Sequence, residues 1–236
     1  MLVWKEIDYG KMSEKEKHLL VSEVNILREF RHAHIVRYYD RIIDKSRTKI
    51  YIVMEYCAGG DLAAYIKKCR REKKRIDEEV IWKVFLQMGL ALQQCHLRKE
   101  GTVLHRDLKP ANVFLDIDNN VKLGDFGLAR TLGSESLFAR THVGTPYYMS
   151  PEQIGKKAYN ERTDIWALGC ILYEMACLHT PFEAQTEAVL AAKIKAGRIH
   201  KLPSCYSDAL ARAIYSMIQV SAPMMALNSF LRRVFY

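Results

Sequence analysis

His105-Arg106-Asp107-Leu108-Lys109-Pro110-Ala111-Asn112 is the stretch that decides the fold, and Asp125-Phe126-Gly127 follows it after a short apolar step. Asp107 offers a carboxylate that can accept a hydroxyl proton, and Asn112 offers an amide oxygen that can bind a metal ion. Asp125 adds a second metal-binding group. Transfer of a phosphoryl group from Mg-ATP requires these parts, because its chemistry is positioning and charge neutralisation rather than covalent catalysis. The two stretches together predict a phosphoryl-transfer site.

The chain resembles the catalytic domain of a eukaryotic protein kinase in both stretches and in Ser150-Pro151-Glu152, which follows them. The resemblance implies an α+β fold of two lobes, with a truncated small β-rich lobe before a mainly helical large lobe. It predicts a partial kinase domain over 1–219, in which 1–55 is the remnant of the small lobe and 56–219 is the large lobe. Residues 220–236 are expected to form a divergent tail.

The apolar pattern agrees with strands and one helix first, then helices. Strands are predicted at 2–7, 35–39 and 50–55. Ser13 and Glu16 form a capping-box signature that opens a helix, and Gly59 with Gly60 predicts a turn or hinge. Helical spacing predicts further helices over 81–95, 164–175 and 188–196. The Ser- and Thr-rich stretch 130–142 is expected to be a mobile loop.

Composition narrows the class of protein. The formal net charge is +9, and a basic run at 67–75 carries much of it. A solvated basic surface is the favoured interpretation and an acidic partner the alternative, with no other sign of nucleic-acid binding. The six cysteines are scattered, which disfavours a zinc site or a disulfide framework and favours a reduced compartment. No signal segment or membrane span is recognisable, so a soluble intracellular protein is expected.

The kinase resemblance assigns phosphate binding to the small lobe. It makes Lys5 the contact to the ATP phosphates and Glu23 the ion-pair partner of this lysine. From the residues alone, Glu23 shares a helix face with Leu19 and Leu27, where it needs a partner unless it only edges the apolar stripe. The resemblance favours the ion pair.

The same resemblance predicts the adenosine site after the third strand. Met54 would close the back of the adenine pocket, and the main chains of Glu55 and Cys57 would contact the adenine edge. Asp61 would bind the ribose or, alternatively, serve only as the N-cap of the next helix.

In the large lobe the resemblance makes Asp107 the catalytic base and Lys109 the group that neutralises the transferring phosphate. A lysine at this place is typical of serine/threonine rather than tyrosine kinases, and Gly144-Thr145-Pro146-Tyr147-Tyr148 favours the same class. Asn112 and Asp125 would hold Mg²⁺, which prefers oxygen ligands. ATP and Mg²⁺ are therefore the expected cofactors.

Neighbouring residues have supporting roles in this interpretation. His105, Phe126 and Leu27 would form an apolar stack beneath the site. Arg106 would anchor a phosphate added in the loop that follows, because a phosphothreonine can order such a loop by pairing with arginine. Thr141 is the first candidate for this modification, unless it is an unmodified loop residue. Behind it come Ser134, Ser136 and Thr145.

The resemblance extends to the NIMA-related kinases. It is carried by the stretches 3–10, 35–44, 51–62, 113–116 and 138–152. It implies a role in mitosis, the cell cycle or centrosome regulation, with protein Ser and Thr residues as substrates. It also implies a location in cytoplasm and nucleus, extending to the centrosome, and allows a homodimer through regions absent here. Neither nucleic acid nor membrane is an expected partner.

Two departures from the family pattern leave a second function open. The Gly-x-Gly-x-x-Gly loop that covers the ATP phosphates is absent, and no arginine is in register to pair with Glu152 after 219. A splice variant, a fragment or an incomplete gene model would explain both. The alternative to a serine/threonine kinase is thus a catalytically impaired interaction module derived from one.

Overall fold

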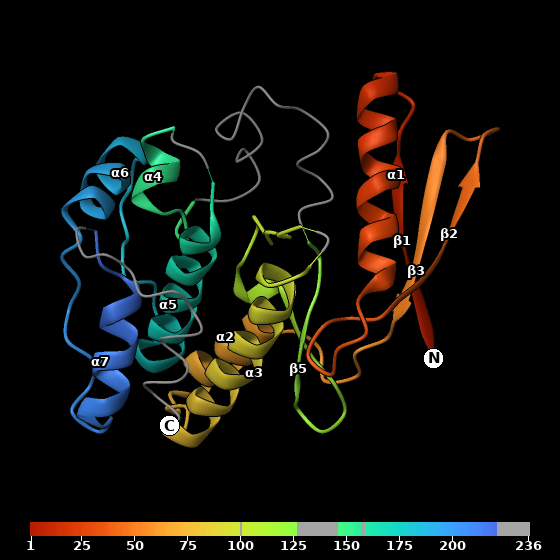
Figure 1. Cartoon of the computed structure of the whole chain (residues 1–236). Coiled ribbons are helices and arrows are strands. Elements are labelled where there is room, and N and C mark those ends of the chain that lie inside the picture. The colour runs from red at the N-terminus through yellow and green to blue at the C-terminus, as the bar shows by residue number, and fades with distance from the viewer. Residues whose placement is uncertain (100, 127–145, 157–158, 221–236) are drawn as a thin grey trace.

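The computed structural model describes residues 1–99, 101–126, 146–156 and 159–220, except for the side chains of Leu19 and Glu23. Figure 1 shows a small sheet beside one long helix, and a larger part built mainly of helices. The elements of the small part are β1 (Leu2–Asp8), α1 (Glu14–Glu29), β2 (Tyr38–Asp44) and β3 (Lys49–Glu55). The predicted α+β architecture, with strands first and helices after, is confirmed.

The three strands form an antiparallel sheet in the order β1-β3-β2. Along β1 the residues alternate between exposed and half-buried, and Lys5 lies on the half-buried face opposite Ile52. Ile50 and Ile52 are fully buried in the same core as the apolar face of α1. Because side chains alternate along a strand, this burial turns Lys5 toward the interior of the molecule.

Helix α1 begins as the sequence predicts. The Ser13 hydroxyl accepts the N–H of Glu16 at 3.3 Å, and the Glu16 carboxylate accepts the N–H of Ser13 at 2.7 Å. Leu20, Val24 and Leu27 are buried one helical turn apart. The capping box therefore fixes where α1 starts, and its apolar stripe fixes which side faces the sheet.

The strand predicted at 35–39 is wrong in its bounds, because the second strand is Tyr38–Asp44. Ile35 forms only an isolated bridge to Leu123, and the Val36 N–H donates to the carbonyl of Leu123 at 2.9 Å. Ile35 and Val36 are buried as a link between the two parts of the molecule. The apolar side chains of Ile35 and Val36 are therefore explained by this contact with Leu123 and not by a strand at 35–39.

The turn predicted at Gly59 and Gly60 is confirmed. Gly60 has a φ of 78°, a left-handed conformation that favours glycine, and a Cβ on Gly59 would lie 2.4 Å from the carbonyl oxygen of Asp116. The chain then enters α2 (Leu62–Glu72), where the Asp61 carboxylate accepts the N–H of Ala64 at 2.8 Å.

The larger part is organised around α5 (Glu161–Cys177), which is buried along nearly its whole length. Helices α3 (Glu78–His96) and α7 (Asp208–Met217) pack against it. The remaining elements are the 3-10 turn η1 (Pro110–Asn112), β4 (Val113–Leu115), β5 (Val121–Leu123), α4 (Pro151–Ile154) and α6 (Glu187–Ala196). The helices predicted over 81–95, 164–175 and 188–196 correspond to α3, α5 and α6 and are confirmed. None of the helices in the described ranges is long and apolar enough to span a membrane.

Candidate active site

Lys109 and Asn112 converge on Asp107. Lys109 Nζ lies 2.9 Å from Asp107 Oδ2. Asn112 Nδ2 donates to the same oxygen at 3.0 Å and to the Asp107 carbonyl at 2.7 Å. The turn η1 brings Asn112 back to Asp107, and because Nδ2 is used there, the amide oxygen of Asn112 is the atom that can face a metal ion. The Asp107 side chain is 40% exposed, so a substrate hydroxyl can reach its carboxylate.

A buried carboxylate of α5 holds the main chain at the start of this stretch. Asp164 accepts the N–H of His105 at 3.0 Å and the N–H of Arg106 at 3.2 Å. It also accepts hydrogen bonds from Nε2 of His96 at 2.8 Å and from the hydroxyl of Tyr159 at 2.5 Å. Arg106 has a φ of 67°, which is strained for a residue with a side chain. These hydrogen bonds stabilise a backbone conformation that Arg106 would otherwise rarely adopt.

Asp164 is fully buried and charged. Burial opposes its charge, but the hydrogen bonds from His96 and Tyr159 outweigh burial, so the pKa of Asp164 lies below its ordinary value. A carboxylate that stays ionised can accept all four hydrogen bonds at once.

His105 and Phe126 pack together beneath the site, as predicted, with ring centroids 4.7 Å apart. Burial lowers the pKa of His105, so its ring is neutral at neutral pH, and Nε2 donates to the carbonyl of Gly124 at 2.9 Å. Phe30 also stacks on Phe126, with ring centroids 6.1 Å apart. Leu27 is buried one turn earlier in α1, but the ring that stacks on Phe126 is that of Phe30.

Asp125 joins the two parts of the molecule. Lys5 Nζ lies 2.8 Å from Asp125 Oδ1, across 120 residues of sequence. The Gly124 N–H donates to the carbonyl of Asn112 at 3.1 Å, which ties the Asp125 segment to the catalytic stretch. Asp125 has a φ of 51°, a second strained position next to the chemistry.

The ion pair expected between Lys5 and Glu23 stays a prediction. Glu23 lies within α1, but its side chain is outside the described part of the structure. The partner that the structure gives Lys5 is Asp125.

Asn112 and Asp125 fit a hard divalent cation. Both offer oxygen atoms, and the chain brings them together through the Gly124–Asn112 hydrogen bond. Within the described ranges no three His, Cys, Asp or Glu side chains cluster as a metal site. A metal held by one carboxylate, one amide, water and phosphate oxygens is the arrangement typical of Mg²⁺.

The residues predicted to bind adenosine lie together at the end of β3. Met54 pairs with Val3 and Tyr38 in the sheet, and Glu55 is the last residue of the strand. Cys57 is half-buried, and burial raises the pKa of its thiol to about 11. In the described ranges, no hydrogen bond to another main-chain group uses the Cys57 N–H, so it can serve a ligand.

Asp61, the other residue predicted for adenosine, forms an observed N-cap bond to Ala64, which is its alternative role. This bond uses only one of the two carboxylate oxygens of Asp61, so the predicted contact to the ribose stays a prediction.

The predicted modification sites cannot be placed. Thr141, Thr145, Ser134 and Ser136 lie outside the described residues, as does the loop predicted at 130–142. Arg106, the predicted phosphate anchor, has an exposed side chain directly before Asp107.

Two contributors escaped the sequence reasoning. Asp164 looked like one polar residue in an apolar helix, although a carboxylate there needs partners as much as Glu23 does. Glu55 was predicted to act through its main chain, but its side chain pairs with Lys122 at 2.8 Å and accepts the N–H of Arg37 at 3.1 Å. Both side chains of that pair are mostly buried, so it ties the end of β3 to β5.

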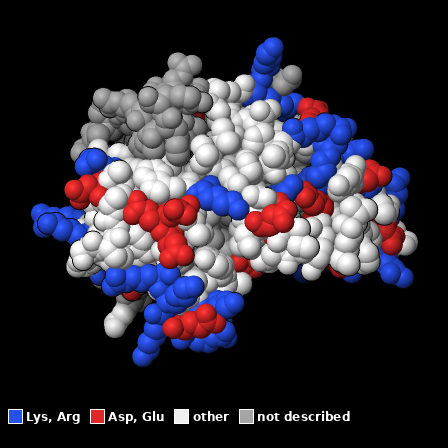
Figure 2. All heavy atoms as spheres, turned by 90° about the horizontal axis from the view of Figure 1, so that it is seen from below, with Lys and Arg blue, Asp and Glu red and all other residues white. Residues whose placement is uncertain are grey.

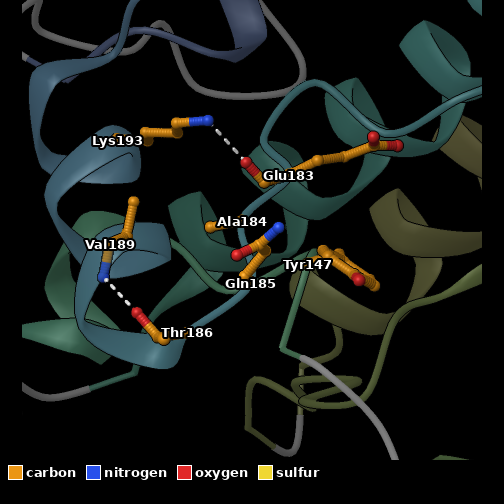
Figure 3. A pocket seen from close by; sticks show the side chains of 7 residues that line it. All are labelled: Tyr147, Glu183, Ala184, Gln185, Thr186, Val189 and Lys193. Atoms are coloured by element: carbon orange, nitrogen blue, oxygen red, sulfur yellow. Dashed lines mark hydrogen bonds between the residues drawn. The ribbon is translucent and has the colours of Figure 1, made fainter.

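A separate hollow of about 590 Å³ lies beside α6 (Figure 3). Tyr147 lines it from the segment before α4, and Val189 and Lys193 line it from α6. Lys193 Nζ donates to the carbonyl of Glu183 at 2.6 Å. Asp107 and its partners do not line this hollow, so it is no part of the metal and base cluster.

Comparison with known proteins agrees with this geometry. The model of the family described as "Protein kinase domain" matches residues 1–230. The chain belongs to the protein kinase family.

Similar kinases include a probable serine/threonine-protein kinase nek2 of Dictyostelium discoideum, 60% identical over 220 residues. That match covers 93% of this chain and 52% of the relative. The serine/threonine-protein kinase Nek2 of Homo sapiens is 58% identical over 222 residues, covering 93% of this chain and 50% of the relative. The G2-specific protein kinase nimA of Emericella nidulans is 42% identical over 245 residues, and the match covers 94% of this chain and 35% of the relative. These relatives confirm the NIMA-related resemblance, and the chain spans about half the length of the first two.

Proposed function

We propose that this kinase chain transfers the γ-phosphate of ATP to Ser and Thr hydroxyls of proteins. The observation that carries the proposal is the convergence of Lys109 and Asn112 on Asp107, with Lys5 and Asp125 paired nearby. In this proposal the Asp107 carboxylate would accept the hydroxyl proton, and the Asp125 carboxylate would bind the metal. The motif around Lys109 and the names of the relatives support serine/threonine specificity.

Each side chain has a distinct role in this proposal. Asp107 orients the substrate hydroxyl and accepts its proton. Lys109 stabilises the charge that the transferring phosphoryl group shares with its oxygens, and Lys5 contacts the phosphates from the small lobe. In the structure, Lys5 pairs with Asp125 and Lys109 pairs with Asp107.

Mg²⁺, when bound, would supply charge neutralisation between the phosphate oxygens. Asn112 and Asp125 would hold it, the first through its amide oxygen and the second through its carboxylate. The end of β3, with Met54, Glu55 and Cys57, would receive the adenine, and Asp61 the ribose. Glu23 would pair with Lys5 once Asp125 binds metal.

The cellular role belongs to the proposal as well. Relatives named G2-specific protein kinases support a function in the cell cycle. Mitotic and centrosomal substrates, a location in cytoplasm, nucleus and centrosome, and homodimerisation all follow from the family resemblance. Phosphorylation of Thr141 or Thr145, with Arg106 as the anchor, would regulate the enzyme.

The test is phosphate transfer from labelled Mg-ATP by the purified chain, onto a generic Ser/Thr substrate and onto itself. The Asp107→Asn variant is expected to lose about 10²–10⁴-fold in rate, because it cannot accept the hydroxyl proton. Thermal unfolding of both forms should coincide, since the side chain is half-exposed.

Equal transfer by both forms would show that another enzyme in the preparation is responsible. No transfer by a folded chain that binds Mg-ATP would leave the alternative, a catalytically impaired interaction module. Among the residues that the structure describes, no observation favours that alternative.

A further inference from the structure

The end of helix α2 carries an unusual concentration of positive charge. Seven of the nine residues in 67–75 are Lys or Arg, and all seven are exposed: Lys67, Lys68, Arg70, Arg71, Lys73, Lys74 and Arg75. We call these seven residues the α2 basic patch. Figure 2 views the molecule from the end where α2 finishes and shows Lys and Arg gathered in groups on this face, with Asp and Glu between some of them.

The fold accounts for only part of this charge. Basic side chains in the last turn, Arg70 and Arg71, favour the negative end of the helix dipole. Arg70 pairs with Glu174 and Arg71 with Glu72. The other five have no ion pair with any residue that the structure describes.

The patch also opposes helix stability. Lys67 faces Arg70 and Arg71 at spacings of three and four residues, and Lys68 faces Arg71 at a spacing of three. Like charges at these spacings repel one another. The helix is nevertheless fixed in place, because Ile66 and Cys69 are buried in the core. A fixed group of seven like charges, five of them without an ion pair among the described residues, is the kind of surface that a negative partner stabilises.

One carboxylate links the patch to the segment before α4. Arg70 Nη2 lies 3.4 Å from Glu174 Oε1, and Tyr148 donates its hydroxyl to the other oxygen of Glu174 at 2.5 Å. Tyr148 belongs to the motif that indicated serine/threonine specificity. A segment bound on the patch would therefore lie close to this motif, to which Glu174 links the patch.

We infer that the α2 basic patch docks an acidic segment, rich in Asp and Glu, of the protein substrate. The inference rests on the proposed kinase function. A peptide fits better than nucleic acid because the basic run spans only nine residues, a length that a short acidic segment can match. Tyr65, the only aromatic residue of α2, is half-buried, so the patch lacks an exposed ring on which bases could stack.

The test is binding of a fluorescein-labelled peptide of Asp, Glu and Gly, without Ser, Thr or Tyr, in the absence of ATP. The patch variant carries Lys67→Gln, Lys68→Gln and Lys74→Gln. A matched control carries Lys11→Gln, Lys15→Gln and Lys45→Gln, three exposed lysines of the small lobe, with the same change in net charge. The patch variant should weaken binding about tenfold, and the control should leave it unchanged.

Three outcomes would overturn the inference. If both variants bound the peptide equally weakly, binding would depend on the net charge of the protein and not on the patch. If the unmodified chain did not bind the peptide at all, the patch would not be a docking site for acidic segments. Tighter binding of a mixed-sequence single-stranded RNA, lost in the patch variant, would assign the patch to nucleic acid. Because the peptide has no Ser, Thr or Tyr that could accept a phosphate, these results are independent of catalysis. The Asp107→Asn variant should therefore bind the peptide as the unmodified chain does. Failure of the kinase proposal would appear only in the transfer assay with a substrate that has no acidic segment.

Discussion

The two halves of the candidate active site are held in different ways. The large-lobe half, with Asp107, is fixed by Asp164, a fully buried carboxylate with four hydrogen-bond donors. The small-lobe half is Lys5, whose side chain is 36% exposed and whose strand β1 has one neighbour in the described sheet. The difference indicates that Asp107, the proposed base, is pre-positioned by the core, whereas Lys5, the proposed phosphate contact, is held by one partly exposed ion pair.

Removal of Asp164 should have the largest effect on the free energy of unfolding. Asp164→Ala leaves two main-chain N–H groups and the ring of His96 without their acceptor in the core. Loss of one partner from a buried charged network costs about 3–5 kcal/mol, so denaturant unfolding should show a loss of this size. Asp118→Ala, at an exposed carboxylate, is the control and should change stability by less than about 0.5 kcal/mol. A loss for Asp164→Ala as small as that of the control would mean that the buried network does not hold the large-lobe half.

The same carboxylate should make stability depend on pH. The pKa of Asp164 is lower in the folded protein than in the unfolded chain, so its contribution is fully present above the unfolded value of about 4. As pH falls below that value and through the lower folded pKa, the unfolded state binds the proton first and this contribution is lost. Unfolding free energies measured from pH 7 down to pH 3 should fall more steeply for the native chain than for Asp164→Asn. Parallel curves would contradict this assignment.

Some of this site could be predicted from the sequence and some could not. Asp107, Asn112 and Asp125 stand in motifs whose residue types and order were sufficient to single them out. The structure brings Asn112 to Asp107 and ties the Asp125 segment to Asn112, whereas their chemical roles stay predictions. Asp164 was missed because its partners, His96 and the main chain of His105, come from elements far away in the sequence. Hydrophobic periodicity locates α5 but says nothing of which polar residue inside it has buried partners.

The fold shows the same division. The capping box placed the start of α1, because its two hydrogen bonds are local. The bounds of β2 were wrong, because Ile35 and Val36 are buried by contact with Leu123, which lies 87 residues beyond Val36. Hydrogen bonds between residues close in sequence can be predicted from residue types. Apolar residues that are buried against a distant segment cannot be distinguished in the sequence from those of a strand.

The cap of α1 offers a smaller test within the small lobe. Ser13→Ala removes the acceptor for the Glu16 N–H and should cost about 1 kcal/mol of unfolding free energy, whereas Ser13→Asp should retain most of it. Ser204→Ala, at an exposed serine that starts no helix, should be neutral. Denaturant titration of the three variants measures the effect. If Ser13→Asp lost as much as Ser13→Ala, the capping interaction would not be what stabilises the start of α1.

Lys5 should show the smallest effect on stability and a large effect on activity. Its pair with Asp125 is partly exposed, so Lys5→Met should cost no more than about 1 kcal/mol in unfolding free energy. Phosphate transfer should nevertheless fall about 10²–10³-fold, because a charge that stabilises the phosphates is lost. Lys49→Met is the matched control, since Lys49 lies on the adjacent strand β3 and pairs with Glu6, which is on the exposed face of β1. If both variants retained full transfer, the phosphate contact would not come from Lys5. If Lys5→Met unfolded the chain instead, the ion pair would be structural, and the contrast between the two halves of the site would disappear.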